Sequence, residues 1–316
     1  MIRLILFGSL LVLIFSGSTI LAETKSKMAI TFDDLPVHGD LPPKTTHLTV
    51  GKSIIATLTA EKIPGVYGFV NASRIQEEKG SEEVLHLWQK AGFPLGNHTY
   101  SHKDLNDLSI EEFKKEIDRN ESLLASINQP GNQSKADLFL RFPYLHEGET
   151  LKKRDAIRTY LKDKKYQIAQ VTDDFKDWAW NTPYARCKTK GDEKGVARLK
   201  QMYLAAADRQ FERDGKVEQA AFGRPIARIL LLHIGPFDAE MLPELISRYR
   251  KKGVEFIGLR EAIQDSAYKE DPALALKDGD LFENQILKAH GKIIKSLGLD
   301  EDDGVPLKEL DTICSH

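Results

Sequence analysis

The stretch MAITFDD, from Met28 to Asp34, is a short apolar run that ends in two adjacent carboxylates. An unbroken apolar run of this length predicts a strand that is buried on both faces, as in a parallel sheet. A helical pattern follows from Thr45 to Lys62, and a second β-rich run lies at Gly65–Val70. Strand, helix and strand in this order predict a βα unit.

The same alternation continues along the chain. Further strands are expected at Phe93–Leu95, Leu138–Phe142, Tyr166–Thr172, Arg228–Ile234 and Glu255–Leu259, and further helices at Ser81–Ala91, Ser109–Ile127, Glu149–Lys164, Lys194–Arg213 and Ala239–Lys252. About seven βα units predict an α/β fold with a parallel barrel, complete or incomplete, in preference to two domains. Residues 265–316 contain helical stretches without a strand pattern. They predict a helical C-terminal extension that packs on the barrel.

The composition is that of a folded globular protein. Of 316 residues 41% are hydrophobic, and 45 basic against 47 acidic side chains leave a formal charge of −2. This balance argues against a nucleic-acid partner. Past the N-terminus no apolar run approaches the roughly 18 residues of a membrane span. The oligomeric state is not predicted.

Residues 1–22 have the pattern of a secretory signal peptide. Arg3 precedes an apolar run from Leu4 to Phe15, and small residues follow. Cleavage is expected after Ala22, with Ser18 as the alternative site and an uncleaved anchor as the rival interpretation. We therefore expect a secreted or periplasmic protein with no stable membrane span after cleavage. In that compartment the only two cysteines, Cys187 and Cys314, are expected to pair rather than to remain free thiols.

Ionisable and aromatic side chains follow five of the expected strands. In chain order they are Asp33 and Asp34, His98 and His102, Arg141 and Tyr144, Asp174, Asp177 and Trp178, and His233. The carboxyl ends of parallel strands meet at one rim, so these groups should lie together. Each is weak evidence alone, because a pair of histidines is often on the surface and a single histidine or tryptophan is often part of the core. Their joint occurrence predicts an active site.

The residue types suit hydrolysis. Two imidazoles, His98 and His102, with one aspartate give a three-ligand site with an open position, the arrangement by which zinc activates water. Zinc is the first choice for this single divalent ion, and cobalt or nickel are alternatives. The neighbouring aspartate would be a general base that Arg141 keeps ionised and oriented. His233 would protonate a leaving nitrogen, and a backbone N–H, proposed at Tyr144, would hold the oxyanion.

The sequence resembles the polysaccharide deacetylases of the NodB-like type, carbohydrate esterase family 4. The motifs that carry the resemblance are Thr31-Phe32-Asp33-Asp34, His98-Thr99-Tyr100-Ser101-His102, Arg141-Phe142-Pro143-Tyr144, Asp174-Phe175-Lys176-Asp177-Trp178 and Leu230-Leu231-Leu232-His233. The resemblance spans about residues 28–259 and implies a distorted, incomplete (β/α) barrel.

The resemblance also implies roles for individual residues. Asp33 would be the catalytic base. Asp34, His98 and His102 would be the metal ligands. His233 would be the catalytic acid. Arg141 and Asp177 would tune the base and the acid.

The sequence departs from the family at several places. Leu35 stands where the family usually has glycine, and Asp173 offers a second candidate for the role of Asp177. The insertion at about 181–224 and the tail have no counterpart in the family motifs and are expected to flank the groove. The expected organisation is a signal peptide at 1–22, a catalytic domain at 23–264 with that insertion, and a helical extension at 265–316.

The function predicted on these grounds is a secreted, metal-dependent deacetylase. Its substrate and partner would be an acetylated glycan, of chitin or peptidoglycan type, from which it removes N-acetyl groups. Two alternatives stay open. The same site would act on O-acetyl esters or on a non-carbohydrate amide, or the chain would be a catalytically silent carbohydrate-binding homologue.

Overall fold

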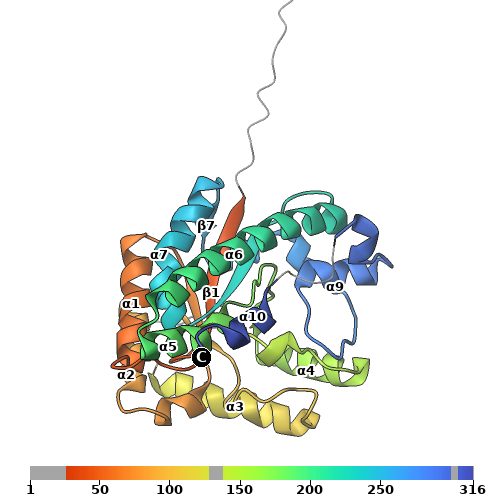
Figure 1. Cartoon of the computed structure of the whole chain (residues 1–316). Coiled ribbons are helices and arrows are strands. Elements are labelled where there is room, and N and C mark those ends of the chain that lie inside the picture. Colours follow the sequence, from red (N-terminus) through yellow and green to blue (C-terminus); the bar gives the residue numbers. More distant parts are fainter. Residues whose placement is uncertain (1–25, 128–137, 300–304, 316) are drawn as a thin grey trace, which may run out of the picture.

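The computed structural model describes residues 26–127, 138–299 and 305–315, so the expected signal peptide lies outside the described residues. Within these ranges, seven parallel strands form one sheet in the order β5-β4-β3-β2-β1-β6, with β7 paired to β1 (Figure 1). The strands are β1 (Lys27–Leu35), β2 (Tyr67–Val70), β3 (Leu95–Asn97), β4 (Phe139–Leu140), β5 (Gln167–Ile168), β6 (Arg228–His233) and β7 (Glu255–Ile257). The expected parallel α/β architecture is confirmed.

The sheet curls into an incomplete barrel because the chain beyond β5 returns to the opposite edge. Asp173 forms a parallel bridge with Leu230 of β6, and the Leu231 N–H donates to the Asp173 carbonyl at 2.9 Å. The expected strand at Tyr166–Thr172 is therefore only two residues long as β5. Its last residues leave β4 to pair with β6 instead.

Helices cover the sheet and form the tail. They are α1 (His47–Ala60), α2 (Ser81–Lys90), α3 (Ile110–Ile127), α4 (Leu151–Asp163), α5 (Asn181–Lys190), α6 (Glu193–Phe222), α7 (Pro236–Lys251), α8 (Leu259–Ala262), α9 (Phe282–Ala289) and α10 (Leu307–Thr312). The helix α6 is longer than the expected Lys194–Arg213, since the Asp192 side chain caps its start and Gly223 ends it at a φ of 69°. No helix among the described residues is long and apolar enough to cross a bilayer.

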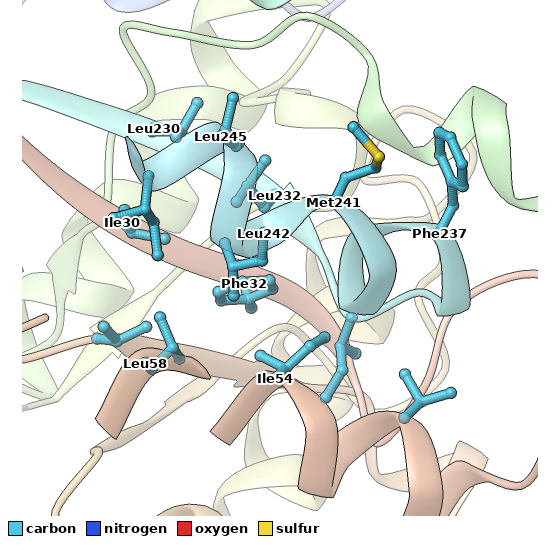
Figure 2. Packing of buried hydrophobic residues seen from close by; sticks show 14 of the residues in the cluster. Ile30, Phe32, Ile54, Leu58, Leu230, Leu232, Phe237, Met241, Leu242 and Leu245 are labelled. Carbon is cyan, nitrogen blue, oxygen red and sulfur yellow. The ribbon is translucent and has the colours of Figure 1, made fainter. Parts of the chain in front are cut away.

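The main core lies between the β1–β6 pair and two helices, α1 and α7. Figure 2 shows Ile30 and Phe32 of β1 and Leu230 and Leu232 of β6 facing Ile54 and Leu58 of α1 and Leu242 and Leu245 of α7. These side chains are at most 1% exposed. Burial of one such side chain contributes roughly 1.5–3 kcal/mol, so β1 and β6 are firmly held. These two strands carry Asp33, Asp34 and His233 of the candidate site.

The C-terminal extension packs on the barrel, as expected. The Phe282 N–H at the start of α9 donates to the Val171 carbonyl at 2.8 Å, and α9 lies against α6. The expected disulfide is formed between Cys187 of α5 and Cys314, 127 positions apart. A cavity of about 690 Å³ remains between the tail, α4 and the open edge of β5. No predicted site residue lines it.

Candidate active site

The site is built at the carboxyl ends of neighbouring strands. Asp33 of β1 and His233 of β6 are register partners, and Asp34 follows Asp33 at a left-handed φ of 66°. His98 directly follows β3 and Arg141 directly follows β4, two strands that pair with each other. The sheet therefore brings four separate motifs to one rim.

Asp34, His98 and His102 form a group whose ligand atoms all lie within 4.8 Å of one another. The Nε2 atoms of His98 and His102 lie 3.6 and 3.5 Å from Asp34 Oδ1. Ligands about 2.1 Å from a tetrahedral zinc stand about 3.4 Å apart, which these spacings match. Asp34 Oδ1 is buried and has no hydrogen-bond partner within the described ranges. The residues present therefore fit a divalent ion.

Protonation also suits ligation. His98 Nδ1 donates to the Arg141 carbonyl at 2.8 Å, which leaves its Nε2 lone pair free to face Asp34. Burial lowers the pKa of both His98 and His102 to about 4, so both are neutral at pH 7. Burial alone would raise the pKa of Asp34. The hydrogen bond from His38 and the nearby His102 and Arg74 outweigh it, so its pKa lies well below the usual range.

Two residues that sequence reasoning missed hold the outer oxygen of Asp34. His38 Nδ1 lies 2.6 Å from Asp34 Oδ2, and Arg74 Nη2 lies 3.4 Å from the same atom. An ionised carboxylate only accepts hydrogen bonds, so His38 Nδ1 carries the hydrogen. With Oδ2 occupied, Oδ1 faces the two histidines. In the sequence, the spacing of four residues between Asp34 and His38 is the signal that could have indicated this contact. His38 lies outside the motifs that carry the family resemblance.

Asp33 is held by Arg141. The Arg141 Nη1 atom lies 3.1 and 3.3 Å from the two Asp33 oxygens, and both side chains are almost fully buried. The guanidinium is itself fixed, since Nε donates to the Ala169 carbonyl and Nη2 to Thr31 Oγ1. Burial raises the pKa of Asp33, and the positive charge of Arg141 opposes that rise. The arrangement suits a carboxylate that exchanges a proton.

His233 is held by Asp177, not by the rival candidate Asp173. Asp177 Oδ1 lies 2.9 Å from His233 Nδ1, and its Oδ2 accepts from the His233 backbone N–H at 2.6 Å. Asp173 instead pairs with Arg228 of β6, and its Oδ2 lies 3.7 Å from Arg228 Nη1. A carboxylate on Nδ1 fixes the hydrogen there and leaves Nε2 for a reacting group.

Aromatic residues line the rim. The Tyr144 ring lies 4.6 Å from the His102 ring, and 57% of Tyr144 is exposed. Trp178 is also exposed, whereas Trp180 is fully buried in the core. Tyr144 has a φ of 57°, and among the described residues its backbone N–H has no acceptor. Left-handed conformations of non-glycine residues are costly and gather at functional sites.

The tail reaches this rim. A Cβ placed on Gly279 would lie 2.0 Å from the Tyr144 carbonyl oxygen, so the tail backbone touches the Tyr144 loop. The Asn106 side chain donates to the Lys277 carbonyl at 2.7 Å. The extension thus flanks the site, as the sequence predicts.

The departure at Leu35 has a packing reason. Leu35 is fully buried and pairs in register with Val70 of β2. A Cβ on Gly68 would lie 2.4 Å from Leu35 Cδ2, so this leucine fills the space that Gly68 leaves open. The larger side chain therefore points into the core and away from the metal group.

Comparison with known proteins finds similar deacetylases. Residues 21–169 match the family model described as polysaccharide deacetylase. A chitin deacetylase of Arthroderma benhamiae is 28% identical over 156 residues, which cover 49% of this chain and 36% of that protein. A peptidoglycan-N-acetylglucosamine deacetylase of Bacillus cereus is 28% identical over 159 residues, 49% of this chain and 47% of that protein. The match thus covers less than half the length of either relative.

Solved structures show the same fold. A pseudoenzyme of the CE4 family from Bacillus anthracis superposes with a TM-score of 0.51 at 16% identity, covering 76% of this chain and 66% of that one. A mutant described as a CE4 family pseudoenzyme with restored enzymatic activity gives a TM-score of 0.51 at 17% identity, with 76% and 68% covered. Asp177 and His233 lie beyond the residues that the family model matches. Residues 21–169 of the chain thus match the polysaccharide deacetylase family, two deacetylases are similar to about half of the chain, and the fold is that of a CE4 family structure.

Proposed function

We propose that this protein is a secreted, metal-dependent deacetylase that hydrolyses N-acetyl groups of a glycan of the chitin or peptidoglycan type. One observation carries the proposal: a three-ligand metal group, a buried carboxylate paired with arginine, and an imidazole paired with aspartate meet at one rim. The similarity to chitin and peptidoglycan deacetylases supports the choice of substrate class. The expected signal peptide supports secretion.

Asp34, His98 and His102 would hold the ion, and zinc suits two neutral imidazoles and one carboxylate. When bound, a divalent ion supplies Lewis acidity that acidifies a water molecule and polarises an acyl carbonyl. Burial keeps both imidazoles neutral. His38 binds Oδ2 of Asp34, so that Oδ1 faces the two histidines.

The remaining residues would move protons. Asp33 accepts a proton from the attacking water, and Arg141 keeps the Asp33 carboxylate oriented toward the reaction. His233 donates a proton to the amine nitrogen as the C–N bond breaks, while Asp177 holds its ring. The Tyr144 N–H donates to the oxygen on which negative charge develops. Exposed Tyr144 and Trp178 offer flat faces for a sugar ring.

The domain organisation is part of the proposal. Residues 23–264 form the catalytic domain, the insertion at about 181–224 supplies α5 and α6, and residues 265–316 form the extension that borders the rim. A silent, glycan-binding role is less well supported, because the ligands, the base and the acid are all present and converge. The similarity to a pseudoenzyme shows the fold only.

A substrate panel tests the function. The zinc-loaded mature protein is incubated with acetylated chito-oligosaccharides, peptidoglycan fragments and an O-acetylated polysaccharide, and acetate release is measured. We expect acetate from an N-acetylated glycan, and background release from the Asp33→Asn variant. Release from O-acetyl esters alone would change the substrate class, and no release from any glycan would contradict the proposal.

A further inference from the structure

A second buried carboxyl lies behind the His233–Asp177 pair. Asp238, in the first turn of α7, and Asp177 are both 0% exposed. The two carboxyls are neighbours that change each other's pKa: a side-chain contact between them lowers the pKa of Asp177 and raises the pKa of Asp238. On its other side, Asp238 Oδ1 accepts from the Tyr203 hydroxyl at 2.8 Å. The four side chains His233, Asp177, Asp238 and Tyr203 therefore form one continuous chain that leads from the rim into the core.

The contact between the two carboxyls requires a proton. Ionised carboxylates are acceptors only, so two of them bond each other only when one is protonated. Asp238 Oδ2 receives no hydrogen bond from an amide, amine or hydroxyl group in the described part of the chain. Asp238 Oδ2 is thus the oxygen available for the contact with Asp177. Two like charges in one buried site would also repel strongly.

The surroundings place that proton on Asp238. Asp177 already accepts from the His233 ring, from the His233 backbone N–H and from the Trp178 backbone N–H. Among the described residues, the Tyr203 hydroxyl is the one group that donates to Asp238. The carboxyl with more donors holds the negative charge better, because each donor stabilises the ionised form. Burial raises the pKa of both carboxyls, which favours the protonated form of one of them.

Aromatic packing fixes the far end of this chain. Tyr203 of α6 is fully buried, and its ring lies 4.9, 5.5 and 5.4 Å from the rings of Phe175, Trp180 and Phe237. Among the described residues, the titratable or charged groups near the chain of four include Asp174 beside Asp177, Tyr249 beside Tyr203, and His38, Asp33 and His98 on the rim side of His233. No arginine or lysine of the described residues pairs with Asp177 or Asp238.

We propose that Asp238 is a positioning residue whose protonated carboxyl donates a hydrogen bond to Asp177, so that a single negative charge spread over two carboxyls holds His233. The inference rests on the proposed role of His233 as the proton donor. A charge confined to Asp177 would stabilise the protonated imidazole more strongly. Spreading that charge onto Asp238 and Tyr203 weakens the attraction between Asp177 and the protonated ring, which favours proton transfer to the leaving nitrogen.

The experiment uses the full mature chain loaded with zinc. In a first variant, Asp238→Asn, the amide still donates to Asp177 and accepts from Tyr203. In a second, Asp238→Leu keeps the branched shape of the side chain but removes both hydrogen bonds. In a third, Tyr203→Phe keeps the ring packing and removes only the hydroxyl. Asp208→Leu is the control, because Asp208 is a carboxylate of the same region that pairs with Arg248 of α7.

The first measurement is the pKa of the His233 ring, taken by NMR on histidine-labelled protein and assigned with His233→Ala. We expect Asp238→Leu to raise this pKa by about one unit, since the full charge then sits on Asp177. Tyr203→Phe should raise it by less, and Asp238→Asn and Asp208→Leu should leave it unchanged. The alkaline limb of the pH profile of kcat should move in the same order.

Two results would overturn the inference. One is a His233 pKa that stays unchanged in Asp238→Leu while the fold is intact by circular dichroism. The other is an equal shift in Asp238→Asn and Asp238→Leu, which would point to packing alone. Should Asp238→Leu fail to fold, Tyr203→Phe and Asp238→Asn decide the question, and the absence of a shift in Tyr203→Phe counts against it. If the variants change the His233 pKa as expected but the wild type releases no acetate, the proposed function is refuted and the shared proton is still supported.

Discussion

Asp33 of β1 and His233 of β6 are register partners in two adjacent parallel strands. Their separation is therefore fixed by the strand pairing itself rather than by loops. Both strands are buried against α1 and α7, so a slip of register would expose the core. The proposed base and the proposed acid are thus held in place by two paired, buried strands.

Arg141 should be needed for turnover but not for metal binding. In Arg141→Met, Asp33 loses the guanidinium that stabilises its ionised form, so we expect acetate release to fall by about 10²-fold or more. The zinc content should persist, since the backbone carbonyl that orients His98 remains. Thr31→Val removes one contact of the guanidinium and should cost much less. A rate in Arg141→Met close to that of wild type would contradict this role.

His38 should set the affinity for the metal. We expect His38→Ala to raise the zinc dissociation constant about 10- to 100-fold, because Asp34 loses the donor that orients it. In His38→Asn, the amide places a donor near the position of Nδ1 and should restore most of the affinity. His86→Ala, an exposed histidine on α2, is the matched control. Competition with a chromogenic chelator gives the constants, and equal values for His38→Ala and wild type would refute the prediction.

The disulfide should stabilise the fold. The chain-entropy effect of joining residues 127 positions apart is at most about 4–5 kcal/mol, so the Cys187→Ser, Cys314→Ser double variant should unfold at lower urea. Its tail should still dock in the native state, since Arg186 donates to the Leu310 and Ile313 carbonyls. Urea unfolding with and without reductant checks this. The wild type should lose stability on reduction while the double variant should not, and a wild-type midpoint that ignores reductant would count against the prediction.

The buried Asp173 should make stability depend on pH. Burial raises its pKa to about 7, above the value of about 3.9 for an unfolded aspartate. The folded state therefore binds an extra proton between these values, and the contribution of Asp173, complete below about pH 4, is lost as the pH rises through 7. We expect Asp173→Asn to gain in unfolding free energy relative to wild type between pH 5 and pH 8. A difference between the two proteins that stays constant over this range would contradict the assignment.

The sequence predicts the parallel α/β fold because its strands are short apolar runs with little ambiguity. It overestimates β5, since pairing of Thr172 and Asp173 with β6 is a long-range choice that local patterns do not contain. It also ends α6 at Arg213, where a run of charged residues looks like a terminus. The cap at Asp192 and the glycine at 223 set the true limits.

The candidate site was also predictable from the sequence only in part. Groups that leave a strand directly, such as Asp33, His98 and His233, could be located because strand ends converge. His38, Arg74 and Asp238 could not, because their roles depend on which way a loop or a helix turns over the rim. Trp178 and Trp180 are two residues apart with opposite exposures, which only the local 3₁₀ turn at Asp177–Trp180 decides.

The most direct test of the account measures zinc content and acetate release together in three proteins: wild type, Asp33→Asn and Asp34→Asn. We predict about one zinc per molecule and turnover in wild type, and retained zinc without turnover in Asp33→Asn, which loses a base but no ligand. Asp34→Asn should lose most of its zinc. Equal loss of zinc in both variants, or full turnover by Asp33→Asn, would contradict the division of labour between these two neighbours.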